Sequence, residues 1–297
     1  MSESTHPDQR GPVVPDPLPL FLFSGMGGYD PKLVDVGIAC QGTVSTVQIA
    51  YPNWRTLRRT PDFDLETLVT DVVGQITRHC APCAVLLAGY SFGGVVAFAA
   101  AARLREEGYT VRFLGLLDVE AQPGLDAAPG ALRAPKTRWQ QLTGFMAAVR
   151  RGEAPSKLAY VSARHLKSPR LRRLLSLYAR IPRRWLRGKF MVYLDRDLLS
   201  EHMEPLLRQW VARRDTLQPL PVPVYLFRTE QHSANAPHHL GWDHHCPDLT
   251  VIPMPGTHLG MLGSSNRPAL CAAFRSAVFE ALGRTTPRTS PIFGTSN

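Results

Sequence analysis

Residues 89–93 read Gly-Tyr-Ser-Phe-Gly and place Ser91 between two glycines. The apolar run 84–88 precedes this segment, and a stretch rich in alanine and valine follows it through Arg105. The pattern predicts a buried strand that turns sharply into a helix. Small residues on both sides of the serine let the strand and the helix approach closely, and the serine oxygen projects at the carboxyl end of the strand. We therefore predict an activated serine nucleophile in strained backbone rather than an ordinary glycine-rich turn.

A serine nucleophile needs a general base and a carboxylate that orients the base. Asp118 comes directly after the strand that follows the serine, and His258 lies in the loop after the last expected strand. Because parallel strands end at one edge of a sheet, both side chains should lie near Ser91. The sequence thus predicts Ser91 as nucleophile, His258 as base and Asp118 as the orienting acid. Asp243, in a later loop, is the alternative acid.

An attacked carbonyl develops negative charge on its oxygen, and N–H groups must stabilise that charge. The N–H of Phe92 stands at the amino end of the helix after Ser91, where helix geometry favours an anion. The second donor is expected in the glycine-rich loop after the first strand. Met26 is the candidate in this loop, and Gly27 is the alternative.

Apolar runs alternate along the chain with amphipathic segments, which predicts an α/β fold with a mostly parallel sheet covered by helices on both faces. Asp64 is a suitable N-cap for the first amphipathic helix. Strands are expected at 18–23, 44–50, 84–88, 111–117, 222–228 and 249–254, and helices at 64–80, through 105 after the serine, and at 267–282.

The alternation is interrupted by a long basic segment that contains no clear strand and has a helical composition. We therefore expect one α/β core with a helical insertion and two tails. The expected limits are 1–17 for a flexible tail, 18–124 and 217–283 for the core, 125–216 for the insertion, and 284–297 for a disordered tail.

The positive charge of the chain is concentrated in this insertion. The net charge is +10, but residues 133–214 alone hold 20 Lys and Arg against five Asp and Glu, and the remainder of the chain is acidic. A basic segment suggests a nucleic acid partner, yet no zinc-finger, RNA-recognition or basic-zipper pattern accompanies it. An acidic protein, a phosphorylated ligand and a solvated arginine-rich helical face explain the charge equally well.

Composition excludes several classes of protein. No apolar run reaches the length of a membrane span, and the proline-rich amino terminus lacks the apolar core of a signal peptide. Five cysteines do not suggest a disulfide framework, and one CxxC at 80–83 is weak evidence for a zinc or redox site. We expect a cytoplasmic protein without a bound metal. Several histidines in one loop lack a defined ligand spacing and more simply border the active site: His232, His238, His239, His244 and His245, beside Cys246.

Taken together, five motifs resemble one family. They are Gly-Tyr-Ser-Phe-Gly-Gly at 89–94, Leu-Leu-Asp at 116–118, Leu-Phe-Arg at 226–228, Leu-Gly-Trp at 240–242 and Gly-Thr-His at 256–258. Apart from the insertion, the chain from 18 to 282 resembles the thioesterase domains of polyketide synthases and nonribosomal peptide synthetases, which belong to the α/β-hydrolase superfamily. Each motif alone is common, whereas their combination is specific.

The resemblance implies an acyl, polyketide or peptidyl chain presented on the phosphopantetheine arm of an acyl or peptidyl carrier protein, with no other cofactor, nucleic acid or membrane. Ser91 would take the acyl group, His258 the proton, and Asp118 would hold the imidazole. Hydrolysis, cyclisation or transfer to an external hydroxyl or amine would then release the chain. An aspartate at this strand end resembles the chain-terminating members, and editing members usually place it one strand later.

In the family, the insertion forms a lid that helps to receive the carrier protein. An editing thioesterase, a general esterase of the same fold and a non-catalytic binding protein are the alternative functions. The amino-terminal Met and the proline-rich tail are compatible with a free-standing enzyme and with an excised terminal domain. Candidate carrier-binding residues in the basic insertion are Arg172, Arg173, Arg183, Arg184 and Arg187.

Overall fold

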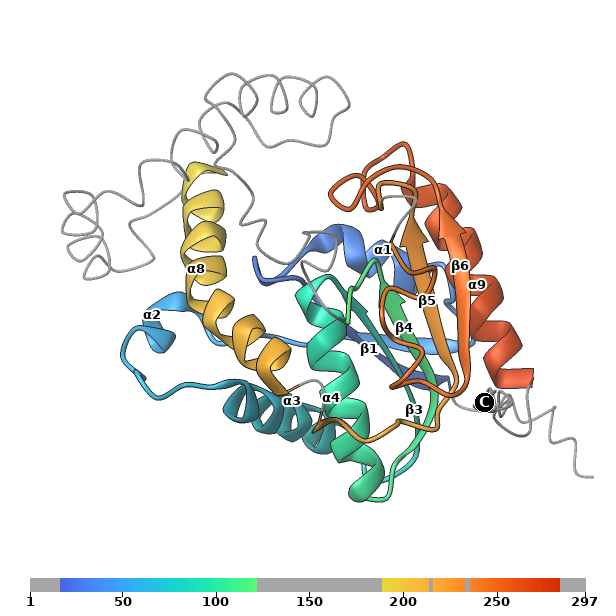
Figure 1. Ribbon diagram of the computed structural model, residues 1–297, viewed down its shortest axis with the longest axis horizontal. Coiled ribbons are helices and arrows are strands. Elements are labelled where there is room, and N and C mark those ends of the chain that lie inside the picture. Colours follow the sequence, from blue (N-terminus) through green and yellow to red (C-terminus); the bar gives the residue numbers. More distant parts are fainter. Residues whose placement is uncertain (1–16, 122–188, 214–215, 233–235, 284–297) are drawn as a thin grey trace, which may run out of the picture.

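The computed structural model describes residues 17–121, 189–213, 216–232 and 236–283. Within them, six parallel strands form one sheet in the order β2-β1-β3-β4-β5-β6, which is visible in Figure 1. The expected parallel sheet is confirmed, and each observed strand overlaps one that the sequence predicts. The strands are β1 (Leu18–Phe23), β2 (Val44–Gln48), β3 (Ala84–Tyr90), β4 (Thr110–Leu117), β5 (Val224–Thr229) and β6 (Leu249–Met254).

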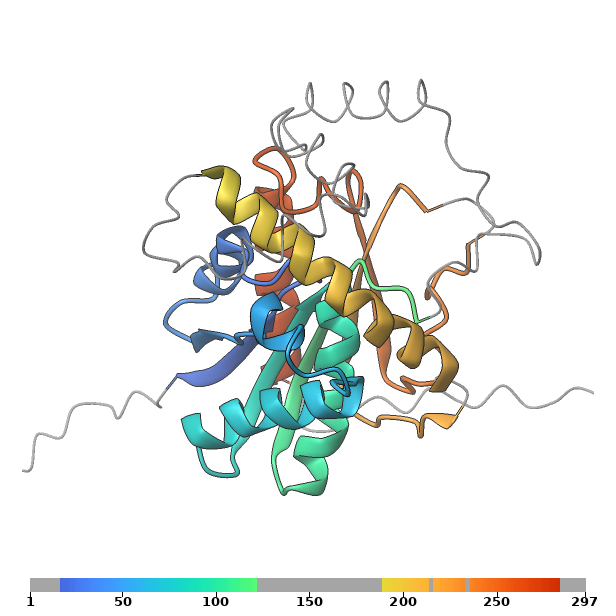
Figure 2. The ribbon, with the colours of Figure 1, turned by 90° about the vertical axis from the view of Figure 1, so that its left-hand side faces the viewer.

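Helices cover both faces of this sheet (Figures 1 and 2). Helices α1 (Pro31–Ile38) and α9 (Arg267–Gly283) pack on one face. The opposite face carries α3 (Leu65–His79) and α4 (Phe92–Glu106), and α2 (Trp54–Leu57) and α8 (Lys189–Arg213) lie on the same side. A fully covered parallel sheet explains why its central strands are continuous apolar runs rather than alternating ones.

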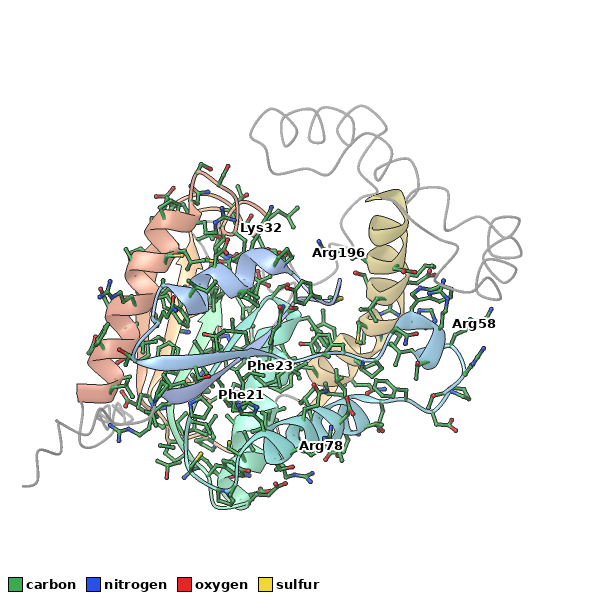
Figure 3. All side chains as sticks on the ribbon, turned by 180° about the vertical axis from the view of Figure 1, so that it is seen from behind. Phe21, Phe23, Lys32, Arg58, Arg78 and Arg196 are labelled. Carbon is green, nitrogen blue, oxygen red and sulfur yellow. The ribbon has the colours of Figure 1, made fainter. Side chains whose placement is uncertain are left out.

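The two hydrophobic cores arise from the two-residue repeat of a strand. In β1, Phe21 and Phe23 belong to the core under α3 and α4, where Figure 3 labels them. Leu20 and Leu22 point to the other face and pack in the core with α1 and α9. The same chain segment therefore holds both helical layers in place at the edge where the site is built.

Local capping explains where the helices begin. The carboxylate of Asp64 accepts a hydrogen bond from Thr67 N at 2.8 Å, which confirms the predicted N-cap of α3. Helix α1 begins in the same way after Asp30, and α2 begins after Asn53. The sequence analysis predicts neither α1 nor α2, because each has only four to eight residues and thus a short apolar repeat.

Helix α8 belongs to the predicted insertion and is joined by hydrogen bonds to the α/β core. Trp54 in α2 donates its indole N–H to Asp195 Oδ1 at 2.6 Å, and Trp210 in α8 donates to the carbonyl of Ala121 at 3.1 Å. Residues 125–188 and 214–215 of the insertion lie outside the described residues. The domain limits remain a prediction.

None of the helices in the described ranges is long and apolar enough to cross a membrane. All five cysteines carry free thiols.

The close approach of β3, α4 and β1 gives a prediction about stability. A Cβ at Gly93 would lie 2.2 Å from the carbonyl oxygen of Phe23, so backbone itself would have to move. We expect Gly93→Ala to lower the free energy of unfolding by about 3 kcal/mol.

The control is Gly74→Ala inside α3, where a Cβ meets nothing closer than the flexible end of Arg78 at 3.4 Å. This control should gain about 0.5–1 kcal/mol, because alanine is the better helix former. Urea unfolding of both variants measures the difference, and equal effects would contradict the steric account.

Candidate active site

Ser91 occupies the turn between β3 and α4. Its backbone has φ of 55°, a left-handed conformation that costs a non-glycine residue about 1–3 kcal/mol. The turn is held from the neighbouring strand, because Ser91 N donates to the carbonyl of Leu117 at 3.1 Å. A Cβ at Gly89 would lie 2.2 Å from the carbonyl oxygen of Gly93, so strand and helix meet where only glycine fits. The strained turn predicted from the sequence is confirmed.

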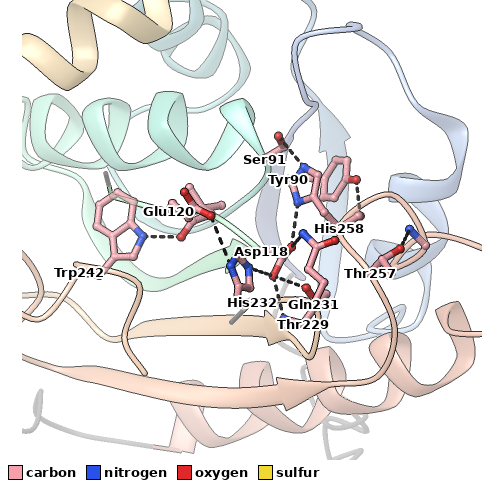
Figure 4. Close-up of polar contacts among 12 residues, drawn as sticks. Tyr90, Ser91, Asp118, Glu120, Thr229, Gln231, His232, Trp242, Thr257 and His258 are labelled. Atoms are coloured by element: carbon pink, nitrogen blue, oxygen red, sulfur yellow. Dashed lines mark hydrogen bonds and ion pairs between the residues drawn. The ribbon is translucent and has the colours of Figure 1, made fainter. Parts of the chain in front are cut away.

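His258 lies in the loop after β6 and reaches Ser91 from the side. Its Nε2 is 3.0 Å from Ser91 Oγ, a contact that Figure 4 draws as a dashed line. Tyr90 fixes this loop in two ways: its hydroxyl donates to the carbonyl of His258 at 2.6 Å, and its ring stacks on the imidazole at 5.1 Å between centroids. The residue before the serine therefore positions the base.

Asp118 follows β4, and its side chain has no exposed surface. Its Oδ2 lies 2.8 Å from His258 Nδ1, so the imidazole contacts the carboxylate with one nitrogen and the serine with the other. Its Oδ1 accepts hydrogen bonds from the backbone N and the hydroxyl of Thr229, at 2.7 and 2.9 Å. Asp118 also has a left-handed backbone, with φ of 53°.

Two further side chains contact the same carboxylate. His232 Nε2 lies 3.0 Å from Asp118 Oδ1, and Gln231 Nε2 lies 3.5 Å from Oδ2. The second ring nitrogen of His232 lies 3.3 Å from Glu120 Oε1. The sequence analysis placed His232 among the loop histidines and missed this contact. The sequence did contain a signal for this contact: His232 follows β5, Asp118 follows β4, and the two strands are neighbours in the sheet.

The environment of Asp118 favours its charged form. Burial by itself raises the pKa of this carboxyl, but hydrogen bonds from His258 and from the N–H of Thr229, with the nearby His258 and His232, outweigh burial. The pKa of Asp118 is therefore lower than its ordinary value. The carboxylate is available at neutral pH to hold the imidazole with its proton on Nδ1, which leaves Nε2 to accept the serine proton.

The glycine-rich loop after β1 lies beside the serine. A Cβ at Gly25 would lie 3.6 Å from Ser91 Cβ, and Met26 is half-buried next to it. Phe92 is the first residue of α4, so its N–H has no partner within the helix. The structure brings the loop and the helix start to Ser91, and the oxyanion roles of Met26 and Phe92 remain predictions.

Other candidates lie elsewhere. Asp243 contacts His239 at 2.8 Å and His244 at 3.5 Å, so Asp118 rather than Asp243 meets His258. The described residues contain no group of three His, Cys, Asp or Glu side chains arranged to hold a metal ion. The predicted carrier-binding residues lie outside the described residues: Arg172, Arg173, Arg183, Arg184 and Arg187.

This arrangement is suited to nucleophilic acyl transfer. A hydroxyl, an imidazole and a buried carboxylate stand in series within hydrogen-bond distance, which is the geometry that lets a serine attack a carbonyl carbon while its proton moves to nitrogen. The exposed fraction of the His258 side chain is 28%, so the reacting end of the series is open to a substrate whereas the carboxylate is closed off.

Comparison with known proteins agrees with this chemistry. The family model for the thioesterase domain matches residues 18–175. A sequence search of curated proteins finds no match.

The solved structures that are similar to the chain include three thioesterase-related proteins. The NocB thioesterase domain, in covalent complex with a fluorophosphonate nocardicin G analogue, is 20% identical, with a TM-score of 0.57 over 90% of this chain and 95% of that one. The Vlm2 thioesterase domain bound with a dodecadepsipeptide is 21% identical, with a TM-score of 0.53 over 87% and 96%. RedJ, with a PEG molecule in its active site, is 18% identical, with a TM-score of 0.57 over 93% and 98%. These likenesses confirm the expected α/β-hydrolase fold.

The lowered pKa of Asp118 gives a prediction about acid stability. A carboxyl with a lower pKa in the folded state stabilises the fold fully above its unfolded pKa, about 3.9, and loses that contribution as pH falls through the lower folded value. We expect Asp118→Asn to lower the free energy of unfolding by about 2 kcal/mol at pH 5, because it removes the charged acceptor of several hydrogen bonds.

The difference in the free energy of unfolding between Asp118→Asn and the wild type should narrow as the pH falls from 5 to 3. Urea unfolding at several pH values measures this difference. A gap that stays constant over this range would show that the charge of Asp118 does not stabilise the fold.

Proposed function

Because the chain belongs to the thioesterase domain family, we propose that it releases an acyl, polyketide or peptidyl chain from a carrier protein by way of an ester on Ser91. The observation that carries this proposal is the 3.0 Å contact between Ser91 Oγ and His258 Nε2, with Asp118 at the other ring nitrogen. Water, a hydroxyl or an amine then takes the acyl group from the serine.

In the first half of the reaction, Ser91 Oγ attacks the thioester carbonyl carbon and its proton moves to His258 Nε2. The resulting imidazolium faces the carboxylate of Asp118, which stabilises it at a contact of 2.8 Å. The carbon–sulfur bond then breaks, and the imidazolium returns its proton to the leaving thiolate of the phosphopantetheine arm. The acyl group is now an ester on Ser91.

In the second half, neutral His258 removes a proton from the incoming nucleophile as it attacks the ester. When the tetrahedral intermediate collapses, the same proton passes from His258 to Ser91 Oγ and the product leaves. Water gives a free acid, and a hydroxyl or amine of the acyl chain itself gives a ring. In both halves, the negatively charged oxygen of the tetrahedral intermediate would accept hydrogen bonds from the backbone N–H groups of Phe92 and of Met26, which lies in the loop beside Ser91.

The position of the acid supports chain release over editing. Asp118 follows β4 and meets His258, and an acid at this strand end is the arrangement that resembles chain-terminating members. The similar Vlm2 domain carries a dodecadepsipeptide, and NocB carries a nocardicin analogue. A role in the biosynthesis of an antibiotic, including its macrocyclisation, is in keeping with these neighbours.

Charge supports an acidic carrier protein as partner. Residues 133–214 carry a large excess of Lys and Arg, whereas the rest of the chain is acidic. Carrier proteins of the family are generally acidic and their arm holds a phosphate, so a basic insertion would steer both toward Ser91.

The first test is covalent capture of the acyl group. We expect intact-protein mass spectrometry to show an acyl adduct when the wild type meets a panel of acyl thioesters, and no adduct for Ser91→Ala, because the alanine has no oxygen to acylate. The analysis of released products, as free acid, ring or ester, then identifies the second half of the reaction.

The matched control is Ser45→Ala, which removes an exposed hydroxyl from β2. It should form the adduct as the wild type does. Turnover that survives in Ser91→Ala at the wild-type rate would overturn the proposed mechanism.

The second test concerns the basic insertion. We expect the double change Arg183→Glu with Arg184→Glu to raise KM for a carrier-bound substrate by about tenfold, because each change reverses a charge that would attract the acidic partner. The KM for a small thioester that is not attached to a carrier protein should change by less than about twofold. Steady-state kinetics with both substrates measures the difference, and equal changes in the two KM values would exclude a carrier-specific role.

A further inference from the structure

Tyr51 contacts both segments from which the oxyanion donors would come. The residue follows β2, and its hydroxyl donates to the carbonyl oxygen of Ser24 at 2.8 Å. Its ring meets the ring of Phe92 edge to face, with 6.5 Å between the centroids and an angle of 72° between the planes. Ser24 leads into the loop of Met26, and Phe92 begins α4. One side chain therefore joins the loop to the helix.

Ser24 is a fixed point at the beginning of this loop. It is buried, and its hydroxyl oxygen accepts a hydrogen bond from Gln48 Nε2 at 2.5 Å. Its carbonyl oxygen lies 2.4 Å from the position of a Cβ at Gly93, so the carbonyl stands directly against the first turn of α4. Burial raises the pKa of Tyr51 above its ordinary value, so the hydroxyl keeps its proton and can donate to this carbonyl.

The loop turns immediately after Ser24. Gly28 N donates to the carbonyl of Gly25 at 3.0 Å, which closes a turn with Met26 and Gly27 at its centre. A carbonyl and the N–H of the next residue share one rigid peptide plane. A hydrogen bond that fixes the carbonyl of Ser24 therefore also fixes the direction in which the turn begins.

We propose that Tyr51 is a positioning residue, which holds the loop of Met26 and the start of α4 at Phe92 at the separation that the oxyanion requires. The proposal deepens the proposed acyl transfer at Ser91 and rests on it. Tyr51 acts through Ser24 and Phe92, because its hydroxyl donates to a backbone carbonyl and its ring packs on a side chain.

The geometry of the oxyanion explains why such a residue affects the rate. Oxyanion donors act at about 2.7–3.1 Å from the charged oxygen, and the loss of one donor lowers kcat by about 100- to 1,000-fold. The two donors proposed here come from different elements, so their separation depends on contacts between those elements. A loop that is held less well weakens one hydrogen bond without removing it. The rate should therefore fall by less than it does when a donor is lost, and binding of the ground state should not change.

The main experiment compares Tyr51→Phe with the wild type in the reaction of Ser91 with an alkyl fluorophosphonate. Ser91 Oγ forms a bond to phosphorus, fluoride leaves, and the serine proton moves to His258, while negative charge develops on the phosphoryl oxygen. We expect the maximal labelling rate constant to fall about tenfold, whereas the probe concentration at half-maximal rate should change by less than about twofold. A maximal rate constant within about twofold of the wild type would overturn the proposal.

Tyr109→Phe is the matched control. The hydroxyl of Tyr109 also donates to a backbone carbonyl, that of Cys80, at 2.6 Å. Tyr109 directly precedes β4, whereas Asp118 follows that strand, so this hydrogen bond lies at the edge of the sheet away from the site. Both variants lose one hydrogen bond of the same kind, and urea unfolding should show a similar loss of stability. Only Tyr51→Phe should label slowly. Equal slowing in the two variants would assign Tyr51 a merely structural role and overturn the proposal.

A second measurement needs no variant. In a mixture of H2O and D2O, carbon NMR of tyrosine labelled at Cζ gives separate signals for the protonated and the deuterated hydroxyl when exchange with solvent is slow. Tyr51 should give two signals, and Tyr29, which is 66% exposed, should give one averaged signal. An averaged signal for Tyr51 would refute the proposal even if Tyr51→Phe fails to fold. Labelling of Ser91 without any thioester turnover would instead count against the proposed function and leave the test of Tyr51 valid.

Discussion

The carboxylate of Asp118 is a negative charge with no exposed surface, and the active centre is arranged around that constraint. A buried carboxylate is stable only when hydrogen-bond donors replace the water that it has lost. The donors come from the ends of two strands: Thr229 closes β5, and His258 stands in the loop after β6. The parallel sheet provides them together, because β4, β5 and β6 are neighbours that end at one edge. The order of the strands in the sheet therefore determines which residues donate hydrogen bonds to this carboxylate.

Strain accompanies this arrangement. Ser91 and Asp118 both have left-handed backbones, although neither is a glycine, and such residues persist only where their surroundings leave no alternative. The surroundings are rigid here: the N–H of Asp118 is bound to the carbonyl of Phe227 at 2.8 Å, and that of Ser91 to Leu117. Both strained residues are therefore fixed by ladders of the central sheet, the part of the molecule with cores on both faces. Placement of the nucleophile and the acid depends on the stability of those cores.

Features that depend on local pattern and on strand order are predictable from the sequence. The six strands, the N-cap at Asp64 and the serine turn each show in a few residues, and Asp118 and His258 are placed by the rule that parallel strands end together. Two things escape such reasoning. Helices α1 and α2 are too short for an apolar repeat, and their starts depend on single caps. The contact of His232 with Asp118 was also missed, because the sequence groups His232 with other histidines such as His244, whose side chain is 83% exposed.

Helix α8 contacts the loop that borders Ser91. Figure 3 shows Arg196 on α8 beside the segment that follows β1. Its guanidinium would meet a Cβ at Gly27 at 3.0 Å, and it lies 3.5 Å from Asp30. Leu199, one turn further, would leave no room for a Cβ at Gly28. The loop is therefore supported from behind by the same helix that ends the basic insertion. Any movement of α8 would therefore act directly on the loop beside Ser91, although the helix and the loop are far apart in the sequence.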